Sequence, residues 1–157
     1  SIIQAHNLCY STMITSNNLH KFSNLSPNDY ESFTISSGTI YFVKPHICQS
    51  LLSRLLTAWL AKRKKIRTEL ASCVDVRTRT ILDKQQLAIK VTCNAVYGFT
   101  GVASGMLPCL NIAETITSQG RKMLEITKLF VEQMDNVALQ SSLKLKVKCN
   151  TESYFRV

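Results

Sequence analysis

A single lysine, Lys90, stands in a long uncharged stretch of the sequence and has the chemistry of an anion-binding group. Between Lys84 and Glu114 no other residue carries a formal charge. An ammonium group on an otherwise apolar segment costs free energy unless an anion compensates it. We therefore expect Lys90 to meet an anionic ligand.

The polar residues near Lys90 share one face of the helix that the sequence predicts for residues 75–97. At about 100° per residue, the residues that fall within about 40° of Lys90 are Asp83, Gln86, Asn94 and Tyr97. The other positions are mostly apolar, so this stripe fits a helix that is buried on most sides and meets a polar ligand on one. The alternative is a buried network in which Lys90 pairs with Asp83 or Glu114.

Two arginines lie on the preceding helix, which the sequence predicts for residues 50–70. Arg63 and Arg67 fall in line with its apolar stripe, whereas the neighbouring lysines splay to the flanks, at Lys62, Lys64 and Lys65. One alternative is that the arginine stems cover the edge of the core while their charged ends reach solvent. Another is that the run 62–67 is a solvated basic face or a nuclear-import sequence.

The connection between the two helices is short, around residues 72–76, so we expect them to pack antiparallel. Such a hairpin can bring Arg63 and Arg67 close to Lys90. Three cations that face one spot require a multiply charged anion, and a triphosphate has the right size. Guanidinium groups bind phosphate oxygens bidentately, whereas a lysine acts as a point charge.

The hydrophobic pattern predicts an α+β fold that is mainly helical. We expect Asp75 to cap the second helix and Gly98 to end it. A third helix is predicted from about residue 112 to residue 134. The remaining expectations are a helical turn or two within 1–14, an exposed loop over 15–29, a β-hairpin of 30–35 with 39–44, a basic strand over 143–149 and the start of another strand at 154–157.

Composition favours a folded domain with an anionic partner. The chain has 157 residues, of which 45% are hydrophobic and 18% charged, and its net charge is +9. This charge favours nucleic acid, a nucleotide or a membrane surface as partner. The six cysteines show neither a Cys-x-x-Cys pair nor a cluster with histidine, which argues against a zinc site and indicates a reducing compartment. No signal peptide or membrane-spanning run is recognisable.

The run 90–98 resembles the motif Lys-x-x-x-Asn-Ser-x-Tyr-Gly of the family B DNA polymerases. Ala95 stands where the family most often has serine, and because a small residue is kept we expect little effect. Longer segments resemble the herpesvirus enzymes of this family: 1–12, 59–67, 82–86, 97–101 and 107–110. The loop 19–22 and the segment 111–115 resemble the roseolovirus branch of the betaherpesviruses.

The resemblance implies part of a right-hand polymerase. Residues 1–49 would form a palm segment with a loop and hairpin insertion, residues 50–98 the helical hairpin of the fingers, and residues 99–157 a second, truncated palm segment. The implied reaction is template-directed, two-metal nucleotidyl transfer from a primer 3′-hydroxyl to an incoming dNTP during viral DNA replication.

The resemblance also implies a role for each matching residue. Arg63, Arg67 and Lys90 would hold the triphosphate, and Lys90 would protonate the leaving pyrophosphate or neutralise its charge. Asn94 would help to position the triphosphate. The nascent base pair would pack against the last two motif residues, Tyr97 and Gly98.

The metal-binding aspartates of the family belong to motifs that we expect just before Ser1 and just after Val157. The Mg²⁺ ions would therefore be held outside this chain, and none of its own aspartates stands in a matching context. We expect an internal fragment that is inactive alone. The implied partners are primer–template DNA, dNTP and a viral processivity subunit, with no membrane, and the implied location is the host cell nucleus.

Two other functions remain open at this point. A non-enzymatic, basic helical module could bind nucleic acid through the run 62–67, with no role for Asn94 or Tyr97. A basic helix lying on a membrane is less consistent with the sequence, because the first helix carries its cations at one end instead of along a full polar face.

Overall fold

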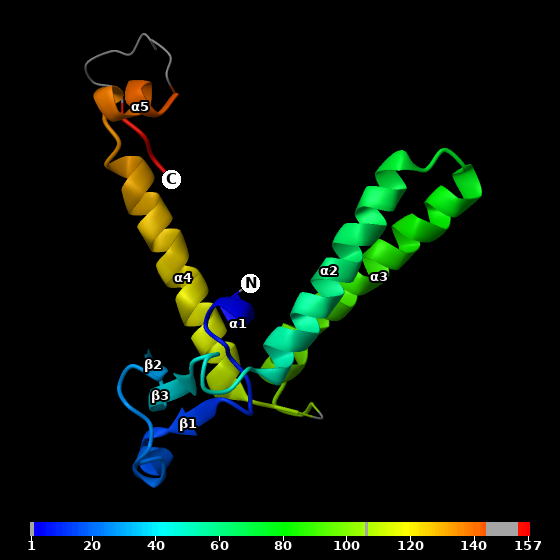
Figure 1. The fold of residues 1–157 in the computed structure, drawn as a ribbon. Coiled ribbons are helices and arrows are strands. Elements are labelled where there is room, and N and C mark those ends of the chain that lie inside the picture. Colours follow the sequence, from blue (N-terminus) through cyan, green and yellow to red (C-terminus); the bar gives the residue numbers. More distant parts are fainter. Residues whose placement is uncertain (1, 106, 144–153) are drawn as a thin grey trace. The chain divides into compact units, whose positions relative to one another are not determined.

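The computed structural model describes residues 2–105, 107–143 and 154–157. The chain divides into two compact units, Ser1–Thr117 and Ser118–Val157. The first unit contains a small sheet, a short N-terminal helix and a long helical hairpin (Figure 1). The helices of the chain are α1 Ile2–Ala5, the 3₁₀ helix η1 Ser16–Lys21, α2 Leu51–Ser72, α3 Val76–Gly101, α4 Leu110–Glu132 and α5 Asn136–Leu143.

The sheet is antiparallel, with strand order β1-β3-β2. Strands β2 (Tyr30–Ile35) and β3 (Gly38–Val43) form the predicted hairpin. Its turn needs Gly38, whose φ of 117° is sterically difficult for residues with a side chain. Strand β1 (Met13–Thr15) pairs with β3 and was not predicted, because three residues are too few to show alternation.

Two hydrophobic clusters hold the first unit together. In one cluster, β2 and β3 point alternate residues towards α4; its buried members are Leu8, Phe33, Ile35, Ile40, Phe42 and Ile112. The other cluster joins the N-terminal segment to α2 and α3; its buried members are Ile3, Cys9, Leu52, Leu56 and Val96. The N-terminal residues thus lie in the core, and their short helix α1 matches the helical turn predicted within 1–14.

Helices α2 and α3 pack side by side as an antiparallel hairpin (Figure 1). The Ser50 hydroxyl caps α2 by accepting from the Ser53 N–H at 3.0 Å, and the Asp75 carboxylate caps α3 by accepting from the Thr78 N–H at 2.8 Å. The hydrogen bonds from Thr78 hold the pKa of Asp75 below its usual value. The predicted hairpin and its Asp75 cap are confirmed.

The predicted helix stop at Gly98 is wrong, because α3 continues to Gly101. A glycine ends a helix when it adopts a left-handed conformation, and among the described glycines only Gly38 has a positive φ. The third predicted helix is confirmed as α4, shifted by two residues at each end. The basic strand predicted over 143–149 falls mostly outside the described residues, although Leu143 ends α5. Residues 154–157 form no strand.

The buried side chain of Asn7 joins three segments at the base of the hairpin. Its Nδ2 donates to the carbonyl oxygens of Val43 at 2.7 Å and of Cys48 at 2.8 Å, and its Oδ1 accepts from the Ser50 N–H at 2.9 Å. The φ of Asn7 is 54°, a left-handed conformation that asparagine tolerates better than most residues. Asn7 therefore ties the end of β3 and the start of α2 to the N-terminal segment.

Replacing Asn7 by alanine should destabilise the protein by about 3 kcal/mol, because one buried N–H and two carbonyl groups lose their partner. Urea unfolding measures the loss. The control Asn17→Ala, at an exposed position of η1, should change the free energy of unfolding by less than about 0.5 kcal/mol. Equal stability of the two variants would contradict this role of Asn7.

The Asp29 carboxylate should make one loop sensitive to acid. Hydrogen bonds from His46 and from the side chain and backbone of Ser26 lower the pKa of Asp29 from 3.8 to about 2. Because the folded-state pKa is the lower one, this stabilisation is complete above pH 3.8 and is lost as the pH falls towards 2. The difference in stability between the wild type and Asp29→Asn should therefore shrink over that interval in acid unfolding. A constant difference would contradict the assignment.

Candidate functional site

Arg63 extends from the middle of α2 to the neighbouring helix α3. Its side chain is half-buried, and its Nε donates to Oε1 of Gln86 at 3.2 Å. The Gln86 amide in turn donates from Nε2 to Oδ1 of Asp83 at 3.1 Å. Arg63 therefore lies against the polar stripe that the sequence places on α3. With its Nε engaged, the two terminal nitrogens of the guanidinium group remain free to bind another acceptor.

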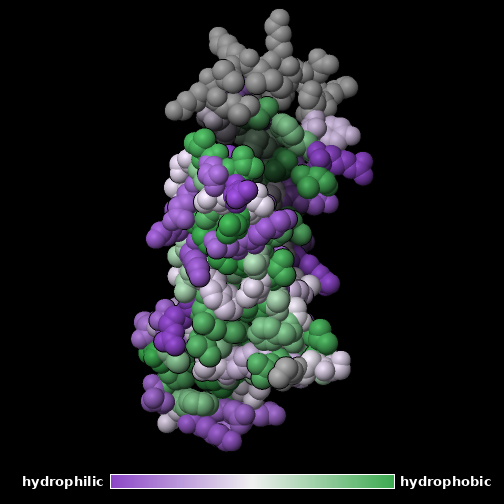
Figure 2. Space-filling view, turned by 90° about the vertical axis from the view of Figure 1, so that its right-hand side faces the viewer, coloured by the Kyte–Doolittle hydropathy of each residue, from purple (hydrophilic) through white to green (hydrophobic). Residues whose placement is uncertain are grey.

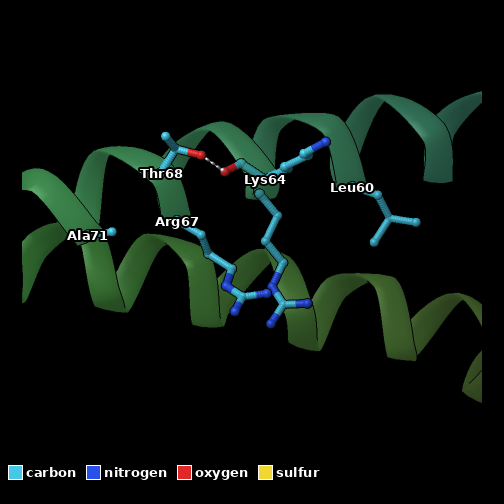
Figure 3. Close-up of a pocket in the computed structure, with 6 residues that line it drawn as sticks. Leu60, Lys64, Arg67, Thr68 and Ala71 are labelled. Atoms are coloured by element: carbon cyan, nitrogen blue, oxygen red, sulfur yellow. Dashed lines mark hydrogen bonds between the residues drawn. The ribbon is translucent and has the colours of Figure 1, made fainter. Parts of the chain in front are cut away.

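An open groove of about 550 Å³ runs along this part of α2. Its lining residues are Leu60, Arg63, Lys64, Arg67, Thr68 and Ala71. Figure 3 shows the Arg67 side chain reaching from α2 towards the second helix. Three cations and no carboxylate line the groove, which suits it to a multiply charged anion.

Lys64 is a groove residue that the sequence analysis placed on the flank of the helix. The groove runs along that flank, because at about 100° per residue Leu60, Lys64 and Ala71 lie within about 40° of one another, to one side of the apolar stripe. The charge run 62–67 was the available signal. Lys62 and Lys65 are exposed and do not line the groove.

Lys90 is exposed on α3 and makes no hydrogen bond or ion pair with the described part of the chain. The alternative of a buried pair with Asp83 or Glu114 is wrong. Asp83 accepts from Gln86, and the Glu114 carboxylate accepts from the backbone N–H and the hydroxyl of Ser36. The ammonium group of Lys90 is therefore available to an external anion.

Helix α3 is much less buried than its apolar composition suggested. Val96 and Thr100 are its buried residues, whereas Val76, Ile81 and Val91 are 76%, 58% and 61% exposed. Figure 2, which views the molecule from the side of the hairpin, shows hydrophobic side chains exposed among hydrophilic ones. A helix with one partner helix buries one stripe only, so the expectation of burial on most sides is wrong for this chain.

The other predicted residues lie near the base of the hairpin. Asn94 and Tyr97 line a cavity of about 380 Å³ whose remaining walls are apolar, formed by Ile2, Ile3, Leu56, Leu60, Cys93 and Ile116. The Tyr97 hydroxyl lies 3.2 Å from the hydroxyl of Thr117 on α4. Leu60 lines both this cavity and the arginine groove, so the two hollows are neighbours.

The residues of the described ranges do not fit a metal centre. No group of three or more histidine, cysteine, aspartate or glutamate side chains converges in that part of the chain. Three aspartate carboxylates already accept hydrogen bonds: Asp29 from His46, Asp75 from the Thr78 N–H at the start of α3, and Asp83 from Gln86. In the described part of the chain, no helix combines the length and the apolar composition that a membrane span requires.

Comparison with known families decides what this cationic hairpin belongs to. The model of DNA polymerase family B matches residues 1–157, which is the whole chain. The chain belongs to DNA polymerase family B. The resemblance read from the run 90–98 is thereby confirmed, and the alternative of a non-enzymatic basic module is not favoured.

Herpesvirus relatives match the family B chain closely. It is 64% identical to the DNA polymerase catalytic subunit of Saimiriine herpesvirus 2 (strain 11) and 62% identical to that of Human herpesvirus 8 type P, in both cases over 157 residues. It is 63% identical over 142 residues to that of Epstein-Barr virus (strain B95-8), a match that covers 90% of this chain and 14% of the relative. The chain spans 16% of the length of the first two relatives.

These relatives correct one expectation. They are gammaherpesvirus proteins, so the predicted similarity to the roseolovirus branch of the betaherpesviruses is not supported. The two segments on which it was based, 19–22 and 111–115, contain only nine residues, too few to assign the chain to one branch of the herpesviruses.

A solved structure supports the fold. The family B DNA polymerase of the archaeon Pyrobaculum calidifontis matches with a TM-score of 0.66 at 21% identity, covering 85% of this chain and 16% of that one. The expected α+β, mainly helical fold of family B is confirmed at this level.

Gly98 offers a test of the site's geometry. A Cβ added at Gly98 meets nothing within 4 Å, and the residue lies inside α3. Gly98→Ala should therefore stabilise the protein by up to about 1 kcal/mol in urea unfolding, because alanine favours the helix. The control Gly38→Ala should destabilise it, because φ at Gly38 is 117°. A destabilising Gly98→Ala would show that the space beside α3 is not open.

Proposed function

We propose that this chain is part of a herpesvirus DNA-directed DNA polymerase and that its α2–α3 hairpin binds the triphosphate of the incoming dNTP. The hairpin, within residues 50–98, would be the fingers, and residues 1–49 and 99–157 would be palm segments. The observation that carries the proposal is the groove in which Arg63, Lys64 and Arg67 face solvent without a carboxylate. Membership of family B supports the class of ligand.

Each cation has a distinct task in this proposal. Arg63 and Arg67 grip phosphate oxygens through their guanidinium forks, which orients the triphosphate. Lys90 acts on the pyrophosphate that leaves, because a mobile ammonium can neutralise developing charge or donate a proton to it. Its exposure and lack of a described partner leave it free for this role.

The cavity at the base of the hairpin supplies the second half of the site. Asn94 can donate its side-chain amide to the triphosphate, while Tyr97 and Gly98 present a flat surface to the nascent base pair. The cavity lined by Asn94 and Tyr97 adjoins the arginine groove at Leu60. This arrangement suits a nucleotide whose phosphates lie in the groove and whose base lies beside the cavity.

The metal ions on which nucleotidyl transfer depends, which we expect to be Mg²⁺, would be bound by residues of the polymerase outside this chain. Primer–template DNA and dNTP are the proposed partners, and the net charge of +9 suits both. We extend the proposal to a viral processivity subunit as a further partner and to the host nucleus as the location.

Alanine variants in the full-length polymerase test the triphosphate role. Lys90→Ala and Arg67→Ala should each raise the KM for dNTP by about 10- to 100-fold, because each removes a charge-assisted contact to phosphate. The affinity for primer–template DNA should change little. Single-nucleotide incorporation and a DNA-binding titration measure the two quantities.

Lys62→Ala is the matched control, since Lys62 is an exposed cation of α2 that lines neither hollow. Its KM for dNTP should stay within about 2-fold of the wild type. If all three variants instead lose DNA affinity to the same extent, with a steep salt dependence, the hairpin is a general nucleic-acid-binding surface and the proposal fails.

A further inference from the structure

Gln86 connects the two helices of the hairpin at the level of the arginine groove. Its Oε1 accepts from Arg63 Nε on α2, at 3.2 Å, and its Nε2 donates to the carboxylate of Asp83 one turn earlier on α3, at 3.1 Å. Gln86 is half-buried, whereas Asp83 is exposed. The three side chains form one continuous hydrogen-bonded line.

The Gln86 amide can form both hydrogen bonds in one orientation only. A guanidinium group only donates hydrogen bonds and a carboxylate only accepts them, so the glutamine between them must turn its oxygen to Arg63 and its nitrogen to Asp83. Rotating the amide by half a turn would oppose two donors at one end and two acceptors at the other. Arg63 and Asp83 together determine which atom of Gln86 faces the arginine.

The acceptor that holds Arg63 is neutral, which matters for an anion-binding group. A carboxylate in the same place would pair with the guanidinium and cancel much of its charge. The amide instead binds Nε and leaves the two terminal nitrogens and the full positive charge directed to the groove with Lys64 and Arg67. It also restricts a side chain that would otherwise sample many rotamers.

The position of Gln86 also relates Arg63 to the ammonium group on α3. Lys90 follows Gln86 by four residues, so the two side chains lie on the same face of α3, one turn apart. An arginine anchored at Gln86 is therefore one helical turn from Lys90 across the same face. Gln86 thereby fixes the distance between the Arg63 guanidinium and the Lys90 ammonium group, and that distance determines whether both can bind the same triphosphate.

We infer that Gln86 is a positioning residue for the nucleotide site: it holds the Arg63 guanidinium in the orientation that receives the triphosphate without neutralising it, and Asp83 holds Gln86. This inference rests on the proposed function, since it needs Arg63 to bind the triphosphate. Gln86 itself does not touch the substrate in this arrangement.

The test uses the full-length polymerase and single-nucleotide incorporation. Gln86→Ala should raise the KM for dNTP by about 3- to 10-fold with a smaller change in kcat, because Arg63 loses its orientation but keeps its charge. Gln86→Glu is close to isosteric and should raise the KM further, because its carboxylate competes with the triphosphate for Arg63. The control Gln85→Ala, at the exposed neighbouring position, should leave the KM within 2-fold of the wild type.

The decisive comparison places Gln86→Ala in an Arg63→Ala background. If Gln86 acts through Arg63, the second substitution should add nothing to the KM once the arginine is gone. A role in hairpin stability alone would raise the KM by the same factor in both backgrounds and would overturn the inference. Urea unfolding of Gln86→Glu, the isosteric variant, separates a folding defect from the loss of binding.

Failure of this inference is distinguishable from failure of the proposed function. If Arg63→Ala raises the KM for dNTP but Gln86→Ala behaves like Gln85→Ala, the positioning role is refuted and the triphosphate site stands. If Arg63→Ala leaves the KM unchanged, the triphosphate site itself is refuted, and the role of Gln86 is refuted with it.

Discussion

The anchoring of α2 at its first turn is the constraint on which the rest of the hairpin depends. Asn7, buried and in a left-handed conformation, joins the end of β3, the loop before α2 and the Ser50 N–H. The apolar cluster beside it includes Leu52, Leu56 and Val96, which lie at the base of α2 and α3. Beyond that base the two helices pack mainly against each other. The orientation of the hairpin, and with it the position of its cations, is therefore set by the contacts at the base.

The cations on the hairpin are not neutralised by described carboxylates, an arrangement that costs stability and that the proposed binding of an anion would compensate. Arg63, Lys64 and Arg67 line one groove without a carboxylate, and Lys90 has no described partner. Like charges held close together raise the free energy of the folded chain until an anion neutralises them. Because Arg63 contacts a neutral amide, its positive charge is not neutralised within the chain. An ion pair in the same place would neutralise it.

Sequence reasoning succeeded where one local signal sufficed. The Asp75 cap of α3, the β-hairpin of 30–35 with 39–44 and the extent of α4 to within two residues follow from short patterns that the structure confirms. The errors arose where the local structure depends on contacts with other parts of the chain. Gly98 is compatible with both the inside and the end of a helix, and three-residue β1 forms only because β3 offers it an edge.

The resemblance of the run 90–98 and of longer segments to a known motif indicated the family of this chain. Helical spacing predicted its two long helices and the face on which Lys90, Asn94 and Tyr97 lie. Only the tertiary structure shows which polar groups from distant parts of the chain meet. Arg63 with Gln86, Glu114 with Ser36 and Tyr97 with Thr117 are pairs whose partners are 20 or more positions apart in the sequence. Their meeting depends on how helices pack against each other and against the sheet, and that is set by packing over the whole first unit, which no local pattern encodes.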